Sequence, residues 1–482
     1  GVIETTLIKK AQTITSGFPF FSQVCQKSAC SLITKKINNM YKIFFLFLVG
    51  TFITSVQAQT QISGTITNEQ GEALPGATVY LPEQNKGTVS NAKGHYQIRN
   101  LPSGITKIQF SFLGYQTEIK EINMARDTQK NLDISLKKAI IKSQEVVVTG
   151  MGVSSQHDNA VKIEVLKSKE INQSGTPKMM QALTSIPGVD MIAKGQGVAK
   201  PVIRGLSMND ILVMINGVRI ENYQYGENHP LGVDNNHIDK VEVIKGPASL
   251  LYGSDAIGGV INFTKEKPAP TGSLAGSYMT QLHSNTRGIN NNISLKGASE
   301  NIFGSISANH KTHTDYKQGN GQFVPNSRFN EWSISTNSGY TGKNGTFRVF
   351  YDYYNQELGM SVPPVQSLVT EANRKNRVWY QDLEHHLVNA RNTLFLGDFK
   401  WHINGAWQSA LRKLQTEMED PAVEMRLNTM TFDTKLELST RNKINYTLGM
   451  QGMNQKNRNL NNRQSQFLPD ANVNNFGILF LT

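Results

Sequence analysis

The stretch 244–263 constrains the fold of this chain more than any other part of the sequence. Pro247 can open a helical turn, because the N–H that proline lacks is not needed at the first position of a helix. Gly253 can end that turn in a left-handed conformation. Gly258-Gly259 then allows close backbone packing just before the apolar strand Val260 to Phe263. The stretch therefore predicts a tightly turned, compact segment without a catalytic constellation.

Two signals upstream belong to the same small domain. Pro177 follows a potential N-cap, Thr176, and predicts a helix start, and the next apolar residues fall on one helical face. These core candidates are Met179, Met180, Leu183 and Ile186. Further on, Asn216-Gly217 separates two apolar strings, which is the strongest short hairpin signal. A mixture of helix and hairpin signals predicts an α+β domain.

These motifs closely resemble the plug domain of TonB-dependent outer-membrane receptors. The resemblance is carried by the strand 238–243, the stretch 244–263 and the tripeptide Ile203-Arg204-Gly205. It implies that residues 155–267 are the plug, and that its motif residues shape the domain and catalyse nothing. The implied structural residues are Arg204, Gly205, Gly246, Pro247, Gly253, Gly258 and Gly259.

Residues 60–138 read as a small β-sandwich. Apolar residues alternate at Ile62, Gly64 and Ile66, and Pro75-Gly76 marks one of several turns. The order of strands and turns resembles the carboxypeptidase-regulatory-like domain, which is common at the N-terminus of such receptors in Bacteroidetes-type bacteria. Despite its name, this domain carries no catalytic residues here.

Residues 270–482 change to alternating strings rich in glycine, asparagine, serine and aromatic residues. Two Asn-Gly dipeptides, Asn344-Gly345 and Asn404-Gly405, are predicted to join such strings as turns. This pattern is typical of a transmembrane antiparallel β-barrel, with room for roughly ten strands where plugged transporters have about 22. We expect a partial barrel whose C-terminal strands are missing from the sequence, and a fold that is mainly β throughout.

The N-terminal end carries a predicted export signal. Residues 40–58 combine one basic residue, a short apolar run and the small-residue cleavage signal Val56-Gln57-Ala58. This combination is typical of a secretory signal peptide. Residues 1–39 are expected to be a non-native upstream extension. Both cysteines, Cys25 and Cys30, lie there, so the exported protein would need neither a disulfide nor a thiolate metal site.

The linker 139–154 contains a segment that could pair with a strand of another protein, Glu145-Val146-Val147-Val148-Thr149. Three consecutive valines favour an extended chain that can add to another sheet. The segment resembles the Ton box, which implies capture by the TonB protein of the periplasm through Glu145, Val146, Val147, Val148 and Thr149. The alternative is an ordinary edge strand of the sandwich.

One loop of the plug is rich in metal-ligating side chains. Glu227, His229, Asp234 and His237 lie close together, and imidazole with carboxylate suits zinc, copper or iron. The loop resembles that of a receptor subgroup that includes metal and haem importers. The barrel adds four weaker candidates: His310, His313, His385 and His386. The alternative is that all eight are solvated loop residues.

The resemblance implies a non-enzymatic outer-membrane transporter, exported by its signal peptide, with the N-terminal module in the periplasm. Catalytic and nucleotide-binding motifs are missing, and we expect no cofactor. The net charge of +12 is scattered along the chain, so no nucleic-acid partner is expected. The expected partners are TonB, outer-membrane lipids and a small ligand, plausibly a transition metal, metal chelate or haem. The alternatives are a glycan or peptide importer working with a surface lipoprotein, and a signalling receptor that transports nothing.

Overall fold

The structure is a computed structural model of a chain that divides into two compact units, residues 1–58 and 59–482. It describes residues 60–102, 104–124, 129–139, 146–149, 152–155, 163–174, 179–195, 197–222, 226–227, 229–234, 237–246, 256–397, 399–439, 445–461 and 468–481. The predicted upstream extension, signal peptide and both cysteines lie outside these residues, as do Glu145, Pro247 and Gly253.

The first described module consists of two four-stranded sheets. One contains β1 (Gln61–Asn68), β4 (His95–Arg99), β7 (Gln129–Asn131) and β8 (Ile134–Leu136), and the other contains β2 (Thr78–Leu81), β3 (Lys86–Val89), β5 (Ile105–Ser111) and β6 (Glu118–Asn123). Burial alternates along β1, and Ile62 and Ile66 pack in one core with Val79 and Phe110. The predicted period-two pattern is therefore the pattern of a sandwich core.

The second module is built on a five-stranded mixed sheet in the order β11-β17-β18-β15-β16. Its strands are β11 (Ile163–Lys167), β15 (Ile211–Ile215), β16 (Val218–Arg219), β17 (Ile238–Ile244) and β18 (Gly259–Lys265). A smaller antiparallel sheet contains β12 (Val189–Lys194), β13 (Val198–Ile203) and β14 (Leu206–Ser207). The helices are α3 (Ser168–Gln173), α4 (Met179–Leu183) and the 3₁₀ turn η2 (Met208–Asp210).

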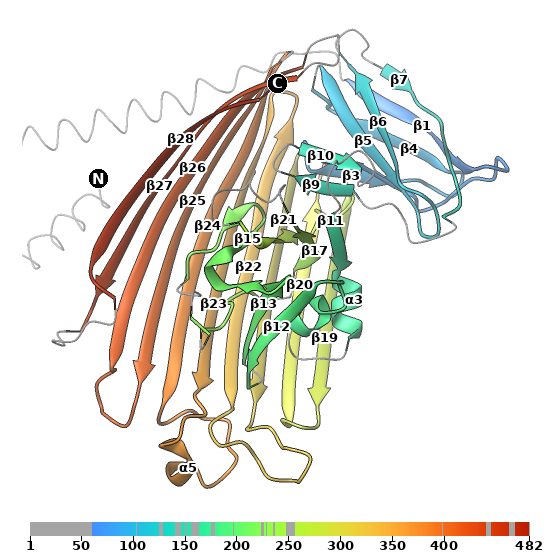
Figure 1. The fold of residues 1–482 in the computed structure, drawn as a ribbon. Coiled ribbons are helices and arrows are strands. Elements are labelled where there is room, and N and C mark those ends of the chain that lie inside the picture. The colour runs from blue at the N-terminus through green and yellow to red at the C-terminus, as the bar shows by residue number, and fades with distance from the viewer. Residues whose placement is uncertain are drawn as a thin grey trace, which may run out of the picture. The chain divides into compact units, whose positions relative to one another are not determined.

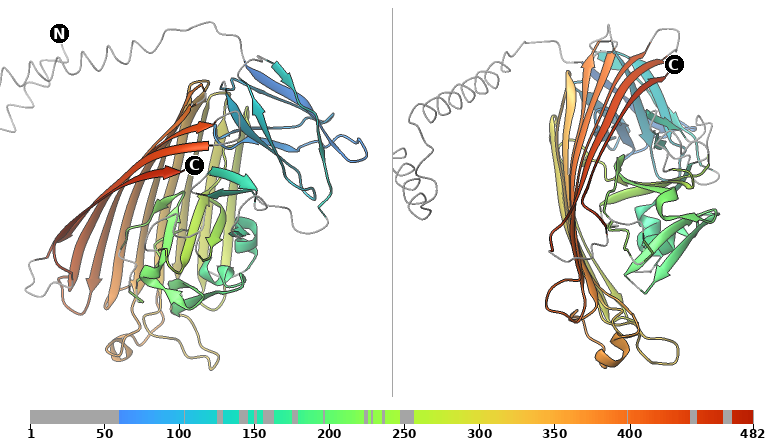
Figure 2. Two further views of the ribbon diagram at one scale, coloured as in Figure 1. Left: turned by 45° about the horizontal axis from the view of Figure 1, so that its top comes forward. Right: turned by 60° about the vertical axis from the view of Figure 1, so that its left-hand side comes forward.

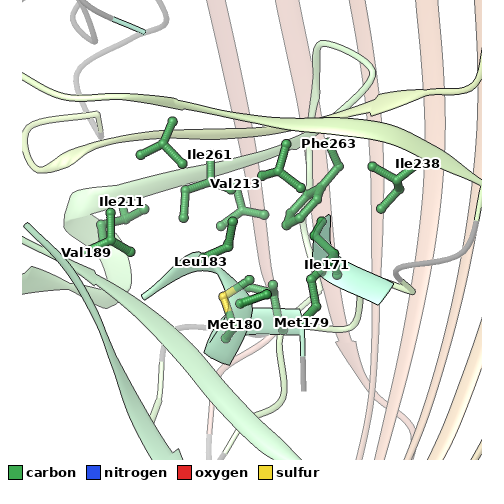
Figure 3. Close-up of a cluster of buried hydrophobic side chains, with 14 of the residues drawn as sticks. Ile171, Met179, Met180, Leu183, Val189, Ile211, Val213, Ile238, Ile261 and Phe263 are labelled. Atoms are coloured by element: carbon green, nitrogen blue, oxygen red, sulfur yellow. The ribbon is translucent and has the colours of Figure 1, made fainter. Parts of the chain in front are cut away.

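One apolar core joins α3 and α4 to the sheets (Figure 3). Met179, Met180 and Leu183 of α4 are buried in this core as predicted, and Ile186 is buried in it too but lies beyond the end of the helix. Figure 3 shows Phe263 of β18 among the side chains around α4. None of the helices in the described ranges is long and apolar enough to cross a membrane.

The glycines of the motif 244–263 that the structure describes do what the sequence predicted. A Cβ on Gly258 would lie 2.9 Å from Leu206 Cβ, and one on Gly259 would lie 2.7 Å from the carbonyl oxygen of Ile244. The predicted hairpin at Asn216-Gly217 is also confirmed, since it joins β15 to β16. Both turn residues have positive φ, 50° and 81°, as a type I′ turn requires.

The third module is one sheet of ten antiparallel strands in chain order (Figures 1 and 2). The strands are β19 (Ser273–His283), β20 (Gly288–Ala298), β21 (Ile302–His313), β22 (Phe329–Gly342), β23 (Gly345–Gly359), β24 (Tyr380–Leu396), β25 (Phe399–Gln415), β26 (Val423–Ser439), β27 (Asn445–Asn459) and β28 (Ala471–Leu481). The number of strands agrees with the sequence estimate. Together with the sandwich and the α+β module, it confirms the predicted fold class.

The two faces of this sheet have the polarity of a membrane barrel. On β21, Ile302 and Ile306 are exposed, whereas Ser307, Asn309 and Lys311 on the opposite face are buried. An apolar exposed face and a polar enclosed face reverse the arrangement of a soluble sheet, and this reversal is expected where the outer face contacts lipid.

One turn prediction is wrong. Asn404-Gly405 lies in the middle of β25, where Asn404 pairs with Arg391 on one side and Asp433 on the other. The turn before β25 lies instead at Gly397, whose φ is 69°. Pairing on both edges over a long strand overrides the local turn preference of Asn-Gly. At the companion dipeptide Asn344-Gly345 the chain does turn between β22 and β23, but the turn residues are 343–344 and Gly345 already belongs to β23.

Candidate ligand site between plug and barrel

The connections of the ten-stranded sheet differ in length at its two ends. One end has the short turns 299–301 and 343–344. The other end has the long connections 314–328 and 360–379, and the second of these contains the helix α5 (Val365–Leu368), labelled in Figure 1. Outer-membrane barrels place short turns in the periplasm and long loops outside the cell. We call the second end the long-loop end.

Two of the predicted barrel histidines face the enclosed side near the long-loop end. His313 is fully buried, with Nδ1 2.7 Å from Thr286 Oγ1 and Nε2 2.8 Å from Asn290 Oδ1. His385 is also buried, with Nε2 3.3 Å from Gln408 Oε1. Both ring nitrogens of His313 are therefore already engaged by neighbouring side chains.

The other two barrel histidines face the opposite side of the wall. His310 stacks on Trp332 with ring centroids 4.1 Å apart, and Trp332 is 50% exposed. His386 lies next to Leu387, which packs into the plug core, and its own Nδ1 is 2.9 Å from the hydroxyl of Tyr351. Because successive strand residues point to opposite faces, neither His310 nor His386 faces the plug.

The plug loop residues are held by separate partners. Asp234 accepts hydrogen bonds from Lys311 Nζ at 3.1 Å and Asn309 Nδ2 at 3.3 Å. His237 has Nε2 3.4 Å from Asn292 Nδ2, and burial lowers the pKa of this imidazole, so the neutral form is favoured. Both residues therefore connect the plug to the inner wall of the barrel.

The remaining two loop candidates interact within the plug itself. Glu227 is exposed and pairs with Lys194 at 2.8 Å, and the hydrogen bond from Lys194 lowers the pKa of the carboxyl. His229 is buried, and its Nδ1 accepts the backbone N–H of Gly226 at 3.2 Å. Within the described ranges, no group of three or more His, Cys, Asp or Glu side chains is placed to hold a metal ion.

The structure reveals a charged interface that the sequence analysis missed. Lys311 also pairs with Glu331, whose other oxygen accepts the hydroxyl of Tyr354 at 3.0 Å. A second contact is formed by Lys265 of the plug, which pairs with Asp352 of β23. In the sequence, β21 and β22 each contain a single Lys, Arg, Asp or Glu, namely Lys311 and Glu331, so no charge pattern marks these strands. Whether Lys311 meets Glu331, and Lys265 meets Asp352, depends on the register of the strands, which cannot be read from the sequence.

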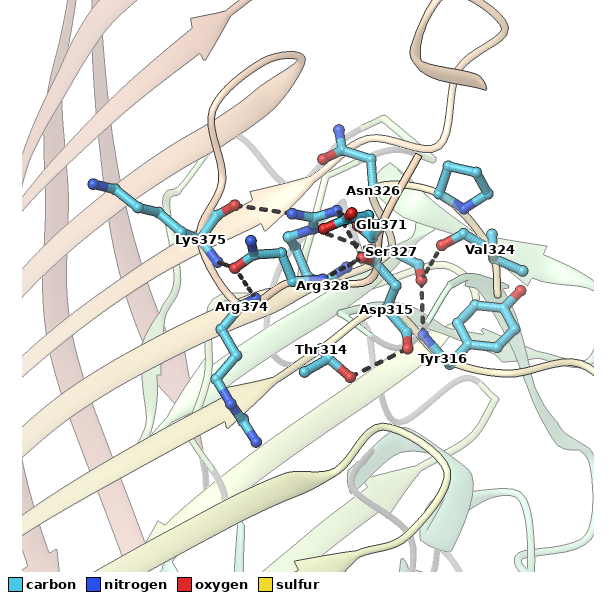
Figure 4. Close-up of polar contacts among 12 residues, drawn as sticks. Thr314, Asp315, Tyr316, Val324, Asn326, Ser327, Arg328, Glu371, Arg374 and Lys375 are labelled. Atoms are coloured by element: carbon cyan, nitrogen blue, oxygen red, sulfur yellow. Dashed lines mark hydrogen bonds and ion pairs between the residues drawn. The ribbon is translucent and has the colours of Figure 1, made fainter. Parts of the chain in front are cut away.

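A buried ion pair braces the connections at the long-loop end (Figure 4). Asp315 and Arg328 contact each other at 2.7 Å, and both side chains are almost completely buried. Arg328 also donates to the carbonyl oxygen of Lys375 at 3.0 Å, and Asp315 accepts the N–H of Asn373 at 3.1 Å. The pair therefore ties the connection 314–328 to the connection 360–379.

Residues 146–149, predicted to pair with a strand of another protein, are extended in the structure. β9 (Val146–Thr149) pairs antiparallel with β10 (Gly152–Ser155), with Val147 opposite Ser154. These two strands form a sheet of their own, separate from the sandwich and plug sheets. Among the strands that the structure describes, none pairs with the other edge of β9.

Comparison with known families agrees with this architecture. Residues 155–260 match the TonB-dependent Receptor Plug Domain, and residues 62–148 match the CarboxypepD_reg-like domain. TonB-dependent receptor P3 of Formosa agariphila is 30% identical over 285 residues, which are 56% of this chain and 26% of that receptor. TonB-dependent receptor SusC of Bacteroides thetaiotaomicron is 30% identical over 260 residues, or 50% of this chain and 25% of SusC.

A solved structure shares the fold. The siderophore receptor PirA from Acinetobacter baumannii superposes with a TM-score of 0.51 at 15% identity, covering 62% of this chain and 48% of PirA. The chain aligns with only about a quarter of the length of the curated relatives named above.

A plug domain docked on a membrane-type antiparallel sheet defines an outer-membrane receptor. The chain is similar to TonB-dependent outer-membrane receptors over its plug segment, and its residues 62–148 match the CarboxypepD_reg-like domain. Its relatives are receptors and transporters, not enzymes.

Proposed function

We propose that the protein imports a scarce ligand across the outer membrane, with energy delivered by a periplasmic TonB protein. The observation that carries this proposal is the docking of the plug on the polar face of the barrel sheet through Asp234 and Lys265. A plug held by hydrogen bonds and ion pairs can be released without unfolding the barrel. Outer-membrane lipids would surround the apolar face.

The ligand site would lie between the plug and the inner wall at the long-loop end. The hairpin β12–β13 supports this position, because Val198 packs against Phe329 and Leu358 where β22 begins and β23 ends. The loop that contains His229 and Asp234 approaches the same wall through Lys311. A ligand arriving from outside would meet these plug segments first.

Energy coupling would act on residues 145–149. β9 already has strand geometry, and no described strand pairs with its edge away from β10, where an added strand would find backbone donors and acceptors. TonB would pair there, and pulling on this segment would draw on the plug that follows it in the chain. The sandwich before it would remain in the periplasm.

For the ligand, we favour a metal chelate or haem over a bare metal ion. The eight predicted ligand residues are dispersed over plug, inner wall and outer wall, and a chelate brings its own donors. Glu227, His229, Asp234 and His237 would then contact the ligand's periphery. The glycan or peptide alternative, with a surface lipoprotein as partner, predicts a different growth phenotype.

A deletion strain complemented with this gene tests the proposal. Under iron limitation, we expect the complemented strain to accumulate more iron from haem or ferric chelates than the deletion strain, measured by elemental analysis of washed cells. Collapse of the proton gradient should abolish the difference. If complementation restores growth only on a polysaccharide or peptide source, the chelate proposal fails and the alternative importer is supported. If it restores neither, transport itself is contradicted.

A further inference from the structure

One buried lysine of the plug has no counter-charge among the residues that the structure describes. Lys200 on β13 is 2% exposed, and none of the described residues forms a hydrogen bond or ion pair with its Nζ. Burying an ammonium group without a partner costs several kcal/mol or more, so such groups are rare unless a ligand or function requires them.

The lysine points toward the barrel wall. Val198, two residues earlier on the same strand, packs against Phe329 and Leu358 of the wall, whereas Ala199 packs against the plug core. Because side chains alternate along a strand, Lys200 shares the wall-facing side with Val198. Arg412 of β25 is also buried and close enough for its charge to act on Lys200.

Nearer the short-turn end, the wall carries side chains of both charges. Arg348 and Arg391 line a cavity of about 1500 Å³ next to the plug turn Asn216-Gly217. Arg391 donates from Nη1 to the carbonyl oxygen of Asn216 at 2.9 Å, so its plug partner is a neutral group. The same cavity is also lined by carboxylates, among them Asp433 and Glu437, so the cationic pair of the proposal is confined to Lys200 and Arg412.

We propose that Lys200 and Arg412 form an anion-binding site between plug and barrel, and that the imported ligand carries a carboxylate, phosphate or sulfate group. This inference rests on the proposed transport function and adds the chemical class of the ligand. An anion placed between the two cations would supply the partner that Lys200 lacks and would form charge-assisted hydrogen bonds with both.

The test uses the receptor purified from outer membranes in detergent and follows its thermal unfolding at pH 6. Sodium sulfate is compared with sodium chloride at equal ionic strength. Saturating sulfate should raise the unfolding midpoint temperature of the wild type by at least about 2 °C more than it raises that of Lys200→Met. Lys200→Met should lose this specific rise and should unfold at a higher temperature than the wild type in chloride, because it buries no charge.

Lys194→Met is the matched control, since Lys194 lies on the same hairpin but is exposed and paired with Glu227. It should keep the sulfate effect of the wild type. If Lys200→Met fails to fold, Arg412→Gln takes its place and should also lose the effect. Equal sulfate effects in the wild type and in the Lys200 or Arg412 variant would overturn the anion site. This binding test needs no transport, so its failure leaves the uptake result of the deletion strain standing.

Discussion

Asp234 of the plug and Lys311 of strand β21 form an ion pair with Oδ1 and Nζ 3.1 Å apart, and both side chains are nearly buried. Lys311 also pairs with Glu331, so a single lysine neutralises one carboxylate from the plug and one from the wall. Removing the lysine would therefore leave two carboxylates facing each other at the interface.

Lys311→Met should loosen the plug. Breaking a buried ion pair by removing one partner typically costs about 3–5 kcal/mol, because a charge is left uncompensated. We expect a lower unfolding temperature and greater sensitivity of cells to large antibiotics that the plug excludes. Lys194→Met is the control, because exposed ion pairs such as Lys194–Glu227 contribute only about 0–1 kcal/mol. An unchanged Lys311 variant would show that this pair does not hold the plug.

Asp315→Asn should weaken the ion pair with Arg328 that connects 314–328 to 360–379 at the long-loop end. The substitution keeps the size of the side chain but leaves the buried guanidinium of Arg328 without its anion. We expect faster hydrogen exchange of backbone amides in 314–328 and 360–379, with β26 and β27 unaffected. Glu419→Gln, in the connection between β25 and β26, is the control. Unaltered exchange in 360–379 would mean that other contacts hold these connections together.

The modules could be predicted from the sequence because their signals are local. Alternation along 60–68, the Asn216-Gly217 turn and the glycines 258–259 each depend on a few neighbouring residues, and the structure confirms them. Asn404-Gly405 failed because pairing on both edges of β25 outweighed its turn preference. The plug–barrel ion pairs could not be predicted, since Asp234 and Lys311 meet only after the strands have found their register.

Gly259→Ala tests how far the plug motif depends on its glycines. The residue has φ 149°, and an added Cβ would lie 2.7 Å from the carbonyl oxygen of Ile244. Strained conformations of this kind cost about 1–3 kcal/mol, and the contact adds to that. The plug should become more sensitive to protease in the purified receptor. Gly319→Ala is the control, because its Cβ would meet nothing within 4 Å. Equal protease resistance of the two variants would contradict this role.

Lys200 gives the receptor a defined pH dependence in the absence of anions. Burial first, and then the charge of Arg412, lowers the pKa of Lys200 to about 7, whereas an unfolded lysine titrates near 10.4. Between these values the unfolded chain binds more protons at this residue, so stability rises with pH. Below pH 7 both states hold the proton and the full penalty remains. Lys200→Met should therefore be more stable than the wild type at pH 6.5, with the gap closing toward pH 9.5. A gap that stays constant over this range would mean that Lys200 does not titrate as stated.

The candidate ligand residues are close together in the sequence, but this proximity does not bring them into one shared site. Glu227, His229, Asp234 and His237 lie within one short loop, yet the structure gives each a separate partner. On a strand, neighbours such as His385 and His386 face opposite sides of the wall. Lys200 was not a candidate at all, because a lone lysine in an apolar strand becomes informative only when its burial and lack of a partner are known.

In the transport function proposed above, TonB binds the receptor through strand addition at β9. The most direct measurement is the affinity of the purified periplasmic domain of TonB, from the same organism, for the detergent-solubilised receptor. Val147→Pro should weaken binding at least about tenfold, because proline removes a backbone donor and disfavours the extended pairing. Val147→Thr keeps a β-branched residue and should bind like the wild type. Equal affinity of the wild type and Val147→Pro would contradict recruitment through this strand.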